Sequence, residues 1–399
     1  LSMVFLVMRV LPGDPVALRF EKRADPEDME RMRHILGMDK PLWTQYIEYL
    51  GGIVDIGYLL ENGYPNLGKS MQTYEEVGGQ IFSAFPATLE LAIYSMIIAS
   101  ILGILLGVIS SKSYNSVLDH MVRGFGTVTY AIPIFFLGII FQLIFGVYLR
   151  WLPTGLRLNP SVEPPSGLTI YLSPPSQGFL YHFLLSSIAG LIVSAVYVAM
   201  RRIKHVKFKL KEILISATVF LVTWIAYAYA SWYFVCAGEL HISTGLYTVD
   251  SLLEGNLFTF FESVRTLLLP SLTLGIILSG MFIRMTRTNM LETLRLDFVT
   301  AARARGLKEG TVTYGYALRN AFLPVLTMMG LQFAILLGGA ILTETTFSWP
   351  GLGSYIVQRI SLRDYTAIQG AVVMFGLFVT LVSLVVDILY AYLDPRIRL

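Results

Sequence analysis

The stretch from Ala87 to Ile109, ATLELAIYSMIIASILGILLGVI, decides the fold class. Glu90 is its only charged residue, and about 20 consecutive apolar residues are enough for a helix to cross the hydrocarbon core of a bilayer. Strands of transmembrane barrels are shorter and alternate in polarity. The stretch therefore predicts a membrane-spanning helix.

Six further segments share this character, and a shorter one opens the chain. They are Thr127–Tyr148, Phe179–Met200, Ile213–Ala237, Leu267–Ile283, Ala321–Thr343, Ala367–Tyr392 and, at the start, Leu1–Leu11. Together they predict an all-α membrane protein with about eight spans, of which the first is incomplete at the N-terminus. The composition agrees, because the chain is 55% hydrophobic and only 14% charged, whereas soluble domains carry about 25% charged residues.

Several classes of site are disfavoured by the same composition. The net charge of +3 is too small to suggest binding of nucleic acid. Cys236 is the single cysteine, and the five histidines show no spacing typical of metal ligands, so we expect no metal site in this chain. The sequence also offers no convergent set of catalytic residues.

The positions of lysine and arginine predict the orientation in the membrane, because cytoplasmic loops carry an excess of them. The short connections on one side hold Lys112, Arg123, six cations in Arg201–Lys211, and then Arg284, Arg287, Arg295, Arg303, Arg305, Lys308, Arg319, Arg396 and Arg398. This places both chain ends and the segment DFVTAARARGLKEG (297–310) in the cytoplasm. The long loop 12–86 then lies outside.

That outer loop contains GYPNLGKS at 63–70, which matches the phosphate-binding pattern GxxxxGK[ST]. A phosphate-binding loop needs a buried strand before it and a helix after it. Here the match contains Pro65, lacks alternating strand and helix patterns, and faces away from cytoplasmic ATP. We interpret it as a fortuitous match in a turn.

The cytoplasmic segment DFVTAARARGLKEGTVTYGYALRNAFLP (297–324) resembles the cytoplasmic loop of binding-protein-dependent ABC importer permeases. Thr300 stands where that pattern has glutamate, followed by Ala301, Ala302 and Gly306, with Leu323-Pro324 beyond. Further similar stretches are LPGDP (11–15), LGMDKPLWTQY (36–46), FPATLELA (85–92), ETTFSWPGLG (344–353), RDYTAIQG (363–370) and LDPRIR (393–398). This set is similar to the first permease of the oligopeptide, dipeptide and nickel importers.

The resemblance implies a type I ABC importer transmembrane domain and divides the chain into four parts. Residues 1–86 form the end of the first span and the outer loop, 87–157 the first core spans, and 256–399 the rest of the core with the coupling loop. Residues 158–255 depart from the family and supply two additional spans around RRIKHVKFKLK. Because two is an even number, this insertion leaves the downstream orientation unchanged.

The resemblance also implies the partners and the coupling residues. We expect a second, similar permease, two ATPase subunits that bind ATP and magnesium, an extracytoplasmic substrate-binding protein, and membrane lipid; the chain itself holds no cofactor. The expected ATPase-coupling residues are Asp297, Thr300, Ala301, Ala302, Arg303, Arg305 and Gly306. Small alanines would let the helix seat in a partner groove, and Gly306 would allow the turn that ends it.

Polar groups within the spans mark a candidate translocation path, because a polar group facing lipid is unfavourable. They are Glu90, Gln142, Gln332 and Asp387. Hydrogen bonding between helices is an equally good interpretation of Glu90 and Asp387. Gly103 and Gly107 form a GxxxG pair, which predicts close helix packing.

The outer stretch after the seventh predicted span is the candidate for binding-protein docking or an outer gate. Its residues are Glu344, Phe347, Trp349, Pro350 and Gly351. The leading functional prediction is uptake of oligopeptides or dipeptides. Alternatives are an oligosaccharide permease of the same type, a secondary transporter driven by an ion gradient, which should show internal repeats and broken helices, and a membrane enzyme.

Overall fold

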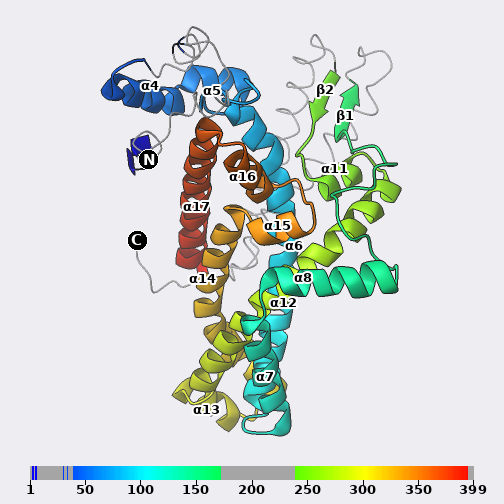
Figure 1. Cartoon of the computed structure of the whole chain (residues 1–399). Helices are drawn as coiled ribbons and strands as arrows, with labels where there is room; N and C mark the ends of the chain where they lie inside the picture. Colours follow the sequence, from blue (N-terminus) through cyan, green and yellow to red (C-terminus); the bar gives the residue numbers. More distant parts are fainter. Residues whose placement is uncertain are drawn as a thin grey trace, which may run out of the picture. The chain divides into compact units, whose positions relative to one another are not determined.

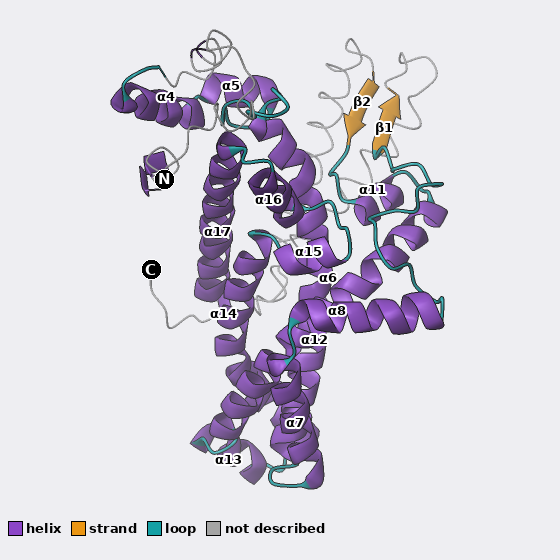
Figure 2. Ribbon diagram, in the orientation of Figure 1, coloured by secondary structure: helices purple, strands orange, loops and turns teal. Residues whose placement is uncertain are grey.

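A computed structural model of the chain describes residues 39–171 and 239–393, with positions 2, 3, 5, 6, 30 and 34 near the start. The predicted spans Phe179–Met200 and Ile213–Ala237, and most of Leu1–Leu11, lie outside the described residues. Figures 1 and 2 show the elements, which are α4 (Leu42–Val54), α5 (Ile56–Asn62), α6 (Val77–Lys112), α7 (Val117–Ala131), α8 (Ile134–Phe141), η1 (Gln142–Tyr148), β1 (Leu168–Tyr171), β2 (Glu239–Ile242), α11 (Tyr247–Leu253), α12 (Leu257–Thr293), α13 (Asp297–Ala304), η2 (Thr311–Ala317), α14 (Leu318–Leu337), α15 (Ile341–Thr346), α16 (Leu352–Ser361) and α17 (Tyr365–Leu393).

The chain divides into two compact units. The first contains residues 1–164, 245–248 and 257–399, and the second contains 165–244 and 249–256. Four helical stretches of the first unit are long and apolar enough to cross a membrane, namely Val77–Lys112, Leu257–Thr293, Thr311–Leu337 and Tyr365–Val385. A bent pair of helices makes a fifth if it counts as one broken span. The predicted all-α membrane class is confirmed.

The core of the first unit is the contact between α6 and α12. A Cβ atom on Gly103 would lie 2.3 Å from the Cβ of Phe282, and one on Gly107 would lie 2.6 Å from the Cβ of Thr286. The two glycines therefore allow α12 to approach α6 more closely than any side chain would permit. The predicted packing role of this GxxxG pair is confirmed.

The predicted span Thr127–Tyr148 is not a single straight helix. It is split into α7 and a second segment in which α8 continues into η1. The axis of this second segment is bent by 102° from the axis of α7. Ile132 has a ψ angle of 129°, because the ring of Pro133 disfavours helical geometry in the residue before it. The bend therefore corrects the expectation of one continuous span.

Two other predicted boundaries also shift. The helix that contains Ala87–Ile109 begins at Val77 and includes Pro86. It therefore starts ten residues before the predicted apolar run. The predicted span Ala321–Thr343 ends at Leu337, and α15 follows as a separate helix. Gly339 lies between them with a φ of +101°, a conformation that glycine adopts readily.

GYPNLGKS forms a packed turn rather than a nucleotide site. Helix α5 precedes it, and the next helix begins only at Val77. Leu67 is buried in a hydrophobic cluster with Ala367, and Ser70 Oγ donates to Asp364 Oδ2 at 2.5 Å. The turn thus joins the outer loop to the start of α17, which supports the interpretation of a fortuitous match.

The second unit contains a hairpin that the sequence did not predict. β1 and β2 pair antiparallel, with Tyr171 opposite Glu239. Residues 172–238, which are outside the described part, therefore begin and end at neighbouring positions. Buried Asp250 accepts hydrogen bonds from Ser243 Oγ and from the backbone and hydroxyl of Thr244. The proposed insertion 158–255 stays a prediction, with which this pairing is consistent.

Candidate functional site: the coupling segment and the buried polar clusters

The predicted coupling segment forms α13, which lies between two spans at the lower end of the bundle in Figure 1. Val299 is fully buried and Ala302 is 3% exposed. Both belong to a hydrophobic cluster that also includes Val108 of α6, Met290 of α12 and Val312 of η2. One face of α13 is therefore fixed to the membrane helices of its own subunit.

The opposite face of α13 is exposed. Its exposed residues include Asp297, Thr300, Ala301, Arg303 and Arg305. Among the predicted coupling alanines, Ala301 points outward and Ala302 inward. The side chain of Arg303 pairs with Glu309, with 2.9 Å between Nε and Oε1.

Gly306 follows the end of α13 with a φ of +74°, as expected for the residue that turns the backbone away from the helix. No atom lies within 4 Å of the position that its Cβ would occupy. The backbone conformation, rather than a lack of space, is therefore the reason for glycine here.

Glu90 is buried in a complete set of partners. Arg157 donates to its Oε2 from Nη2 at 2.9 Å and from Nε at 3.2 Å. The backbone and hydroxyl of Thr248 both donate to its Oε1 at 2.7 Å. Arg157 also donates to the carbonyl of Gly245, and its guanidinium carbon lies 3.7 Å from the ring centroid of Tyr247.

This cluster supports the packing interpretation of Glu90 over direct contact with a substrate. Glu90 is 2% exposed and Arg157 is 8% exposed, and a buried charge needs such partners to be tolerated. Sequence analysis did not identify Arg157 or Thr248. The local sequence offered little signal, because Arg157 lies in a predicted outer loop that also contains Glu163.

Glu344 forms a second buried cluster, which joins α6, α15 and α16. Thr88 Oγ1 donates to its Oε1 at 2.8 Å, and the backbone of Ser354 donates to its Oε2 at 2.8 Å. The backbone of Leu352 in turn donates to Thr88 Oγ1. A Cβ on Gly351 would lie 2.5 Å from the Glu344 carboxyl carbon, so this glycine lets the start of α16 approach the carboxylate.

The other residues of the predicted docking stretch are mostly buried too. Phe347 and Trp349 are each 1% exposed, and the Trp349 indole donates to the carbonyl of Ala87 at 2.8 Å. Pro350 alone among the five is exposed. In this conformation Glu344, Phe347, Trp349 and Gly351 are therefore buried. The role of this stretch in binding-protein docking or as an outer gate stays a prediction.

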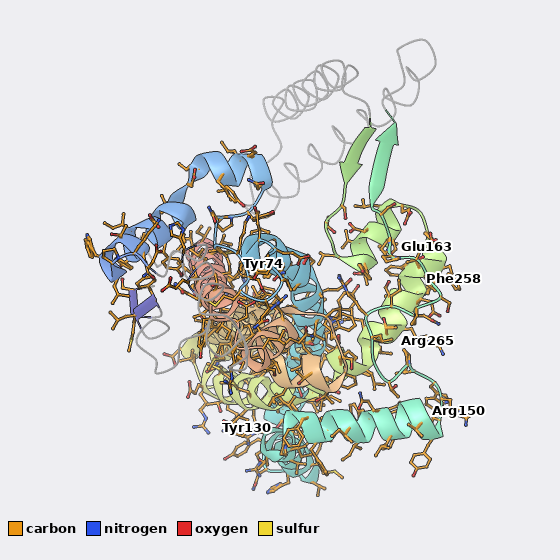
Figure 3. All side chains as sticks on the ribbon, turned by 45° about the horizontal axis from the view of Figure 1, so that its top comes forward. Tyr74, Tyr130, Arg150, Glu163, Phe258 and Arg265 are labelled. Atoms are coloured by element: carbon orange, nitrogen blue, oxygen red, sulfur yellow. The ribbon has the colours of Figure 1, made fainter. Side chains whose placement is uncertain are left out.

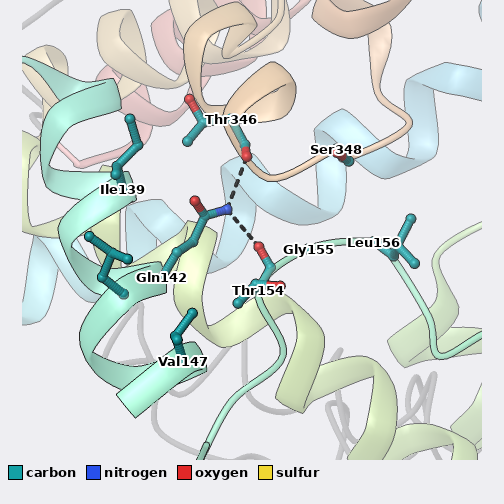
Figure 4. A pocket seen from close by; sticks show the side chains of 9 residues that line it. Ile139, Gln142, Val147, Thr154, Gly155, Leu156, Thr346 and Ser348 are labelled. Carbon is teal, nitrogen blue, oxygen red and sulfur yellow. Dashed lines mark hydrogen bonds between the residues drawn. The ribbon is translucent and has the colours of Figure 1, made fainter. Parts of the chain in front are cut away.

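Gln142 lines a cavity of about 490 Å³ beside α8 and η1 (Figure 4). Its Nε2 donates to the carbonyl of Thr154 at 2.6 Å and to that of Thr346 at 3.0 Å. Gln332 is partly buried, and its amide lies 3.5 Å from Met281 Sδ. The side chain of Asp387 is outside the described part. The described side chains of Glu90, Gln142 and Gln332 bind different partners, and the translocation path stays a prediction.

A buried cluster at the predicted cytoplasmic end was missed by sequence analysis. Asp119 of α7 is fully buried and accepts two hydrogen bonds from Arg287 of α12, at 2.7 and 2.8 Å. Ser110 Oγ and the backbone of Asn115 donate to the same carboxylate. This cluster fixes the α6–α7 connection to α12, and no local sequence spacing predicts it.

At the predicted outer end, Glu76 anchors the start of α6. The hydroxyls of Tyr58 and Tyr64 both donate to its Oε2. These hydrogen bonds lower the pKa of Glu76 because they stabilise the charged carboxylate. Burial and the hydrogen bond to Glu76 raise the pKa of Tyr58 to about 12.

Comparisons with known proteins agree with this architecture. Residues 99–205 and 212–399 match the family described as binding-protein-dependent transport system inner membrane component, and residues 1–92 match its N-terminal family. The chain is 35% identical to the di/tripeptide transport system permease protein DppB of Pseudomonas aeruginosa over 397 residues, which cover 99% of this chain and 93% of the relative. It is 32% identical to the dipeptide permeases of Alkalihalophilus pseudofirmus and Escherichia coli K12, again over 99% of this chain and 93% of each relative.

Proposed function

Because the chain belongs to the family of binding-protein-dependent transport inner membrane components, we propose that it is a permease subunit of an ATP-driven importer for di- and tripeptides. It is a multi-pass membrane protein with several apolar spans. The relatives named for di/tripeptide and dipeptide transport support the substrate class. The break between α7 and α8 matches one feature expected of a secondary transporter, but the family and the named relatives favour the ATP-driven peptide importer over this alternative and over oligosaccharide uptake.

The observation that carries the proposal is the two-sided character of α13. Its buried face, with Val299 and Ala302, is packed against α6, α12 and η2. A displacement of α13 is therefore transmitted directly to the spans. Its exposed face contains Thr300, Ala301 and Arg305. The small side chain of Ala301 is suitable for a groove on an ATPase subunit. ATP hydrolysis with magnesium would then occur in two such partner subunits rather than in this chain.

The rest of the assembly follows from the family. A second permease of the same type would complete the path, and an extracytoplasmic binding protein would deliver the peptide. We place both chain ends and α13 on the cytoplasmic side, because the lysines and arginines of the short loops are concentrated there. The burial of Glu90 and Glu344 favours a structural role for both in this conformation.

Replacing Ala301 by tryptophan tests the proposal in proteoliposomes that contain the complete importer and its binding protein. We expect ATP-dependent uptake of a labelled dipeptide to fall more than tenfold. A partner groove that fits a helix about 10 Å in diameter leaves no room for an indole ring on the contact face. Stimulation of ATP hydrolysis by the binding protein should be lost as well.

Ala131→Trp is the matched control, because Ala131 is also exposed but ends α7, away from the coupling segment. It should retain uptake. Normal uptake by Ala301→Trp would argue against the coupling role. Uptake that persists without ATP in the presence of an ion gradient would instead support a secondary transporter.

A further inference from the structure

A second cavity, of about 480 Å³, lies between α7 and α12 at the predicted cytoplasmic end of the bundle. It is lined by Arg123, Gly126, Thr127 and Tyr130 of α7 and by Gly280, Ile283, Arg284, Arg287 and Thr288 of α12. Neither the Asp119 cluster nor the coupling segment requires a cavity here. Its lining is unusual for so apolar a chain, because three of the nine residues are arginines.

Positive charge in this cavity exceeds the negative charge that faces it. Asp119 is fully occupied by its two hydrogen bonds from Arg287, and Arg123 Nε lies 3.8 Å from the same carboxylate. Among the residues that the structure describes, no carboxylate lies within 4.0 Å of Arg284. Its guanidinium carbon lies 5.4 Å from the ring centroid of Tyr130. Arg123 and Arg287 therefore share one carboxylate, and among the described residues Arg284 has none.

The cavity is shaped by a close helix contact. A Cβ on Gly280 would lie 2.7 Å from the carbonyl oxygen of Gly126, so α7 and α12 are in close contact beside the cavity. The buried side chain of Ile283 adds an apolar wall. Arg123 of α7 and Arg284 of α12 line the cavity and are both exposed, so their guanidinium groups are accessible to an anion.

The position of the cavity relative to the ends of the apolar runs indicates the kind of anion. Arg284 directly follows the apolar span Leu267–Ile283, and Arg123 lies just before the apolar run that starts at Thr127. Tyr130, two turns further along α7, is 66% exposed, and Figure 3 shows it near the start of α8. Exposed tyrosine beside cations is typical of the level of the lipid headgroups.

We infer that this cavity, lined by Arg123, Arg284 and Tyr130, is a binding site for the phosphate headgroup of an anionic phospholipid in the cytoplasmic leaflet. Basic pockets between transmembrane helices on that side suit such headgroups. The planar guanidinium group pairs with phosphate oxygens in a bidentate manner. The site does not depend on which solute the importer carries.

The test uses the complete purified importer in a neutral detergent, with dihexanoyl phosphatidylglycerol as the probe and native mass spectrometry as the readout. We expect bound phosphatidylglycerol in the wild type, and weaker binding of dihexanoyl phosphatidylcholine. The double variant Arg123→Gln/Arg284→Gln should lower the affinity for phosphatidylglycerol by roughly tenfold or more, because each cation contributes to binding of an anionic headgroup. Arg287 is left unchanged, because it holds Asp119.

The matched control is Arg295→Gln/Arg319→Gln, which removes two exposed arginines from the same predicted side but outside the cavity. It should bind phosphatidylglycerol as the wild type does. Equal loss in both double variants, or no loss in the cavity variant, would overturn the proposal. So would competition by inorganic phosphate at the same concentration as the lipid, which would indicate a site for the free anion.

A third contrary outcome concerns the partner permease. If the cavity variant dissociates the two permeases, as seen by size-exclusion chromatography, while the wild type binds no phosphatidylglycerol, the arginines pair with a carboxylate of the partner instead of a lipid. An intact assembly with reduced lipid binding supports the headgroup site.

Discussion

Glu90 illustrates what a buried carboxylate requires in an apolar bundle. Its two oxygens accept four hydrogen bonds, from Arg157 and Thr248. Arg157 directly precedes the proposed insertion 158–255, and Thr248 lies inside it, near its end. A residue that sequence analysis considered for the transport path thus holds distant parts of the chain together, and Glu344 does the same for α6, α15 and α16.

Replacing Arg157 by methionine should destabilise the protein strongly. The change removes the only cation paired with Glu90 among the described residues, and breaking a buried ion pair in this way lowers the free energy of unfolding by about 3–5 kcal/mol. Denaturant unfolding of the purified permease complex measures the loss.

The double variant Glu90→Gln/Arg157→Met is the control for this prediction. A glutamine at position 90 keeps an acceptor for Thr248 but carries no charge, so the double variant should be more stable than the single one. An Arg157→Met protein as stable as the wild type would show that the pair contributes little.

At the level of helices, apolar length predicted each described span, but breaks within a span depend on single residues. The run Thr127–Tyr148 is apolar enough to cross a membrane as one helix, yet Pro133 splits it with a bend of 102°. Hydropathy averages over the proline and cannot detect the bend. The start of α6 at Val77 was also missed, because VGGQIFSAFP is helical without being strongly apolar.

The α6–α12 contact gives a prediction at this scale. Gly103→Leu should force the two helices apart, because even a Cβ at this position would lie 2.3 Å from the Cβ of Phe282. Overpacking of this kind destabilises by about 1–3 kcal/mol or more, and the thermal unfolding midpoint should fall. Gly376→Leu in α17 is the matched control, since no atom lies within 4 Å of its Cβ position; equal effects of both variants would contradict the prediction.

For the whole molecule, the sequence was informative about class and less so about the polar clusters. The membrane fold follows from composition and run length, and α13 follows from the resemblance of its loop. Glu90 and Thr248 are 158 positions apart, and Asp119 and Arg287 are 168 apart. No helical or strand periodicity links residues at such distances, so these pairs become visible only in the folded chain.

The proposed insertion can be tested at this scale. Tyr171 and Glu239 are register partners, so an Asn-Gly turn can replace residues 172–238 without moving the strands. The deletion removes two predicted spans and therefore preserves the orientation of everything that follows. We expect the shortened chain to assemble with its partner permease, with an unchanged elution volume in size-exclusion chromatography. Aggregation of the shortened chain would show that the segment is part of the core.

The length of α6 has a mechanical consequence. Its 36 residues span about 54 Å at 1.5 Å per residue, well beyond the roughly 30 Å of hydrocarbon that it has to cross. Thr88, about a third of the way along α6, contacts Glu344, and Val108 near the C-terminal end packs in the same cluster as Val299 of α13. A helix of this length can transmit a displacement in both directions. We therefore expect a change at the predicted outer side to alter the rate of steps at α13, and the reverse.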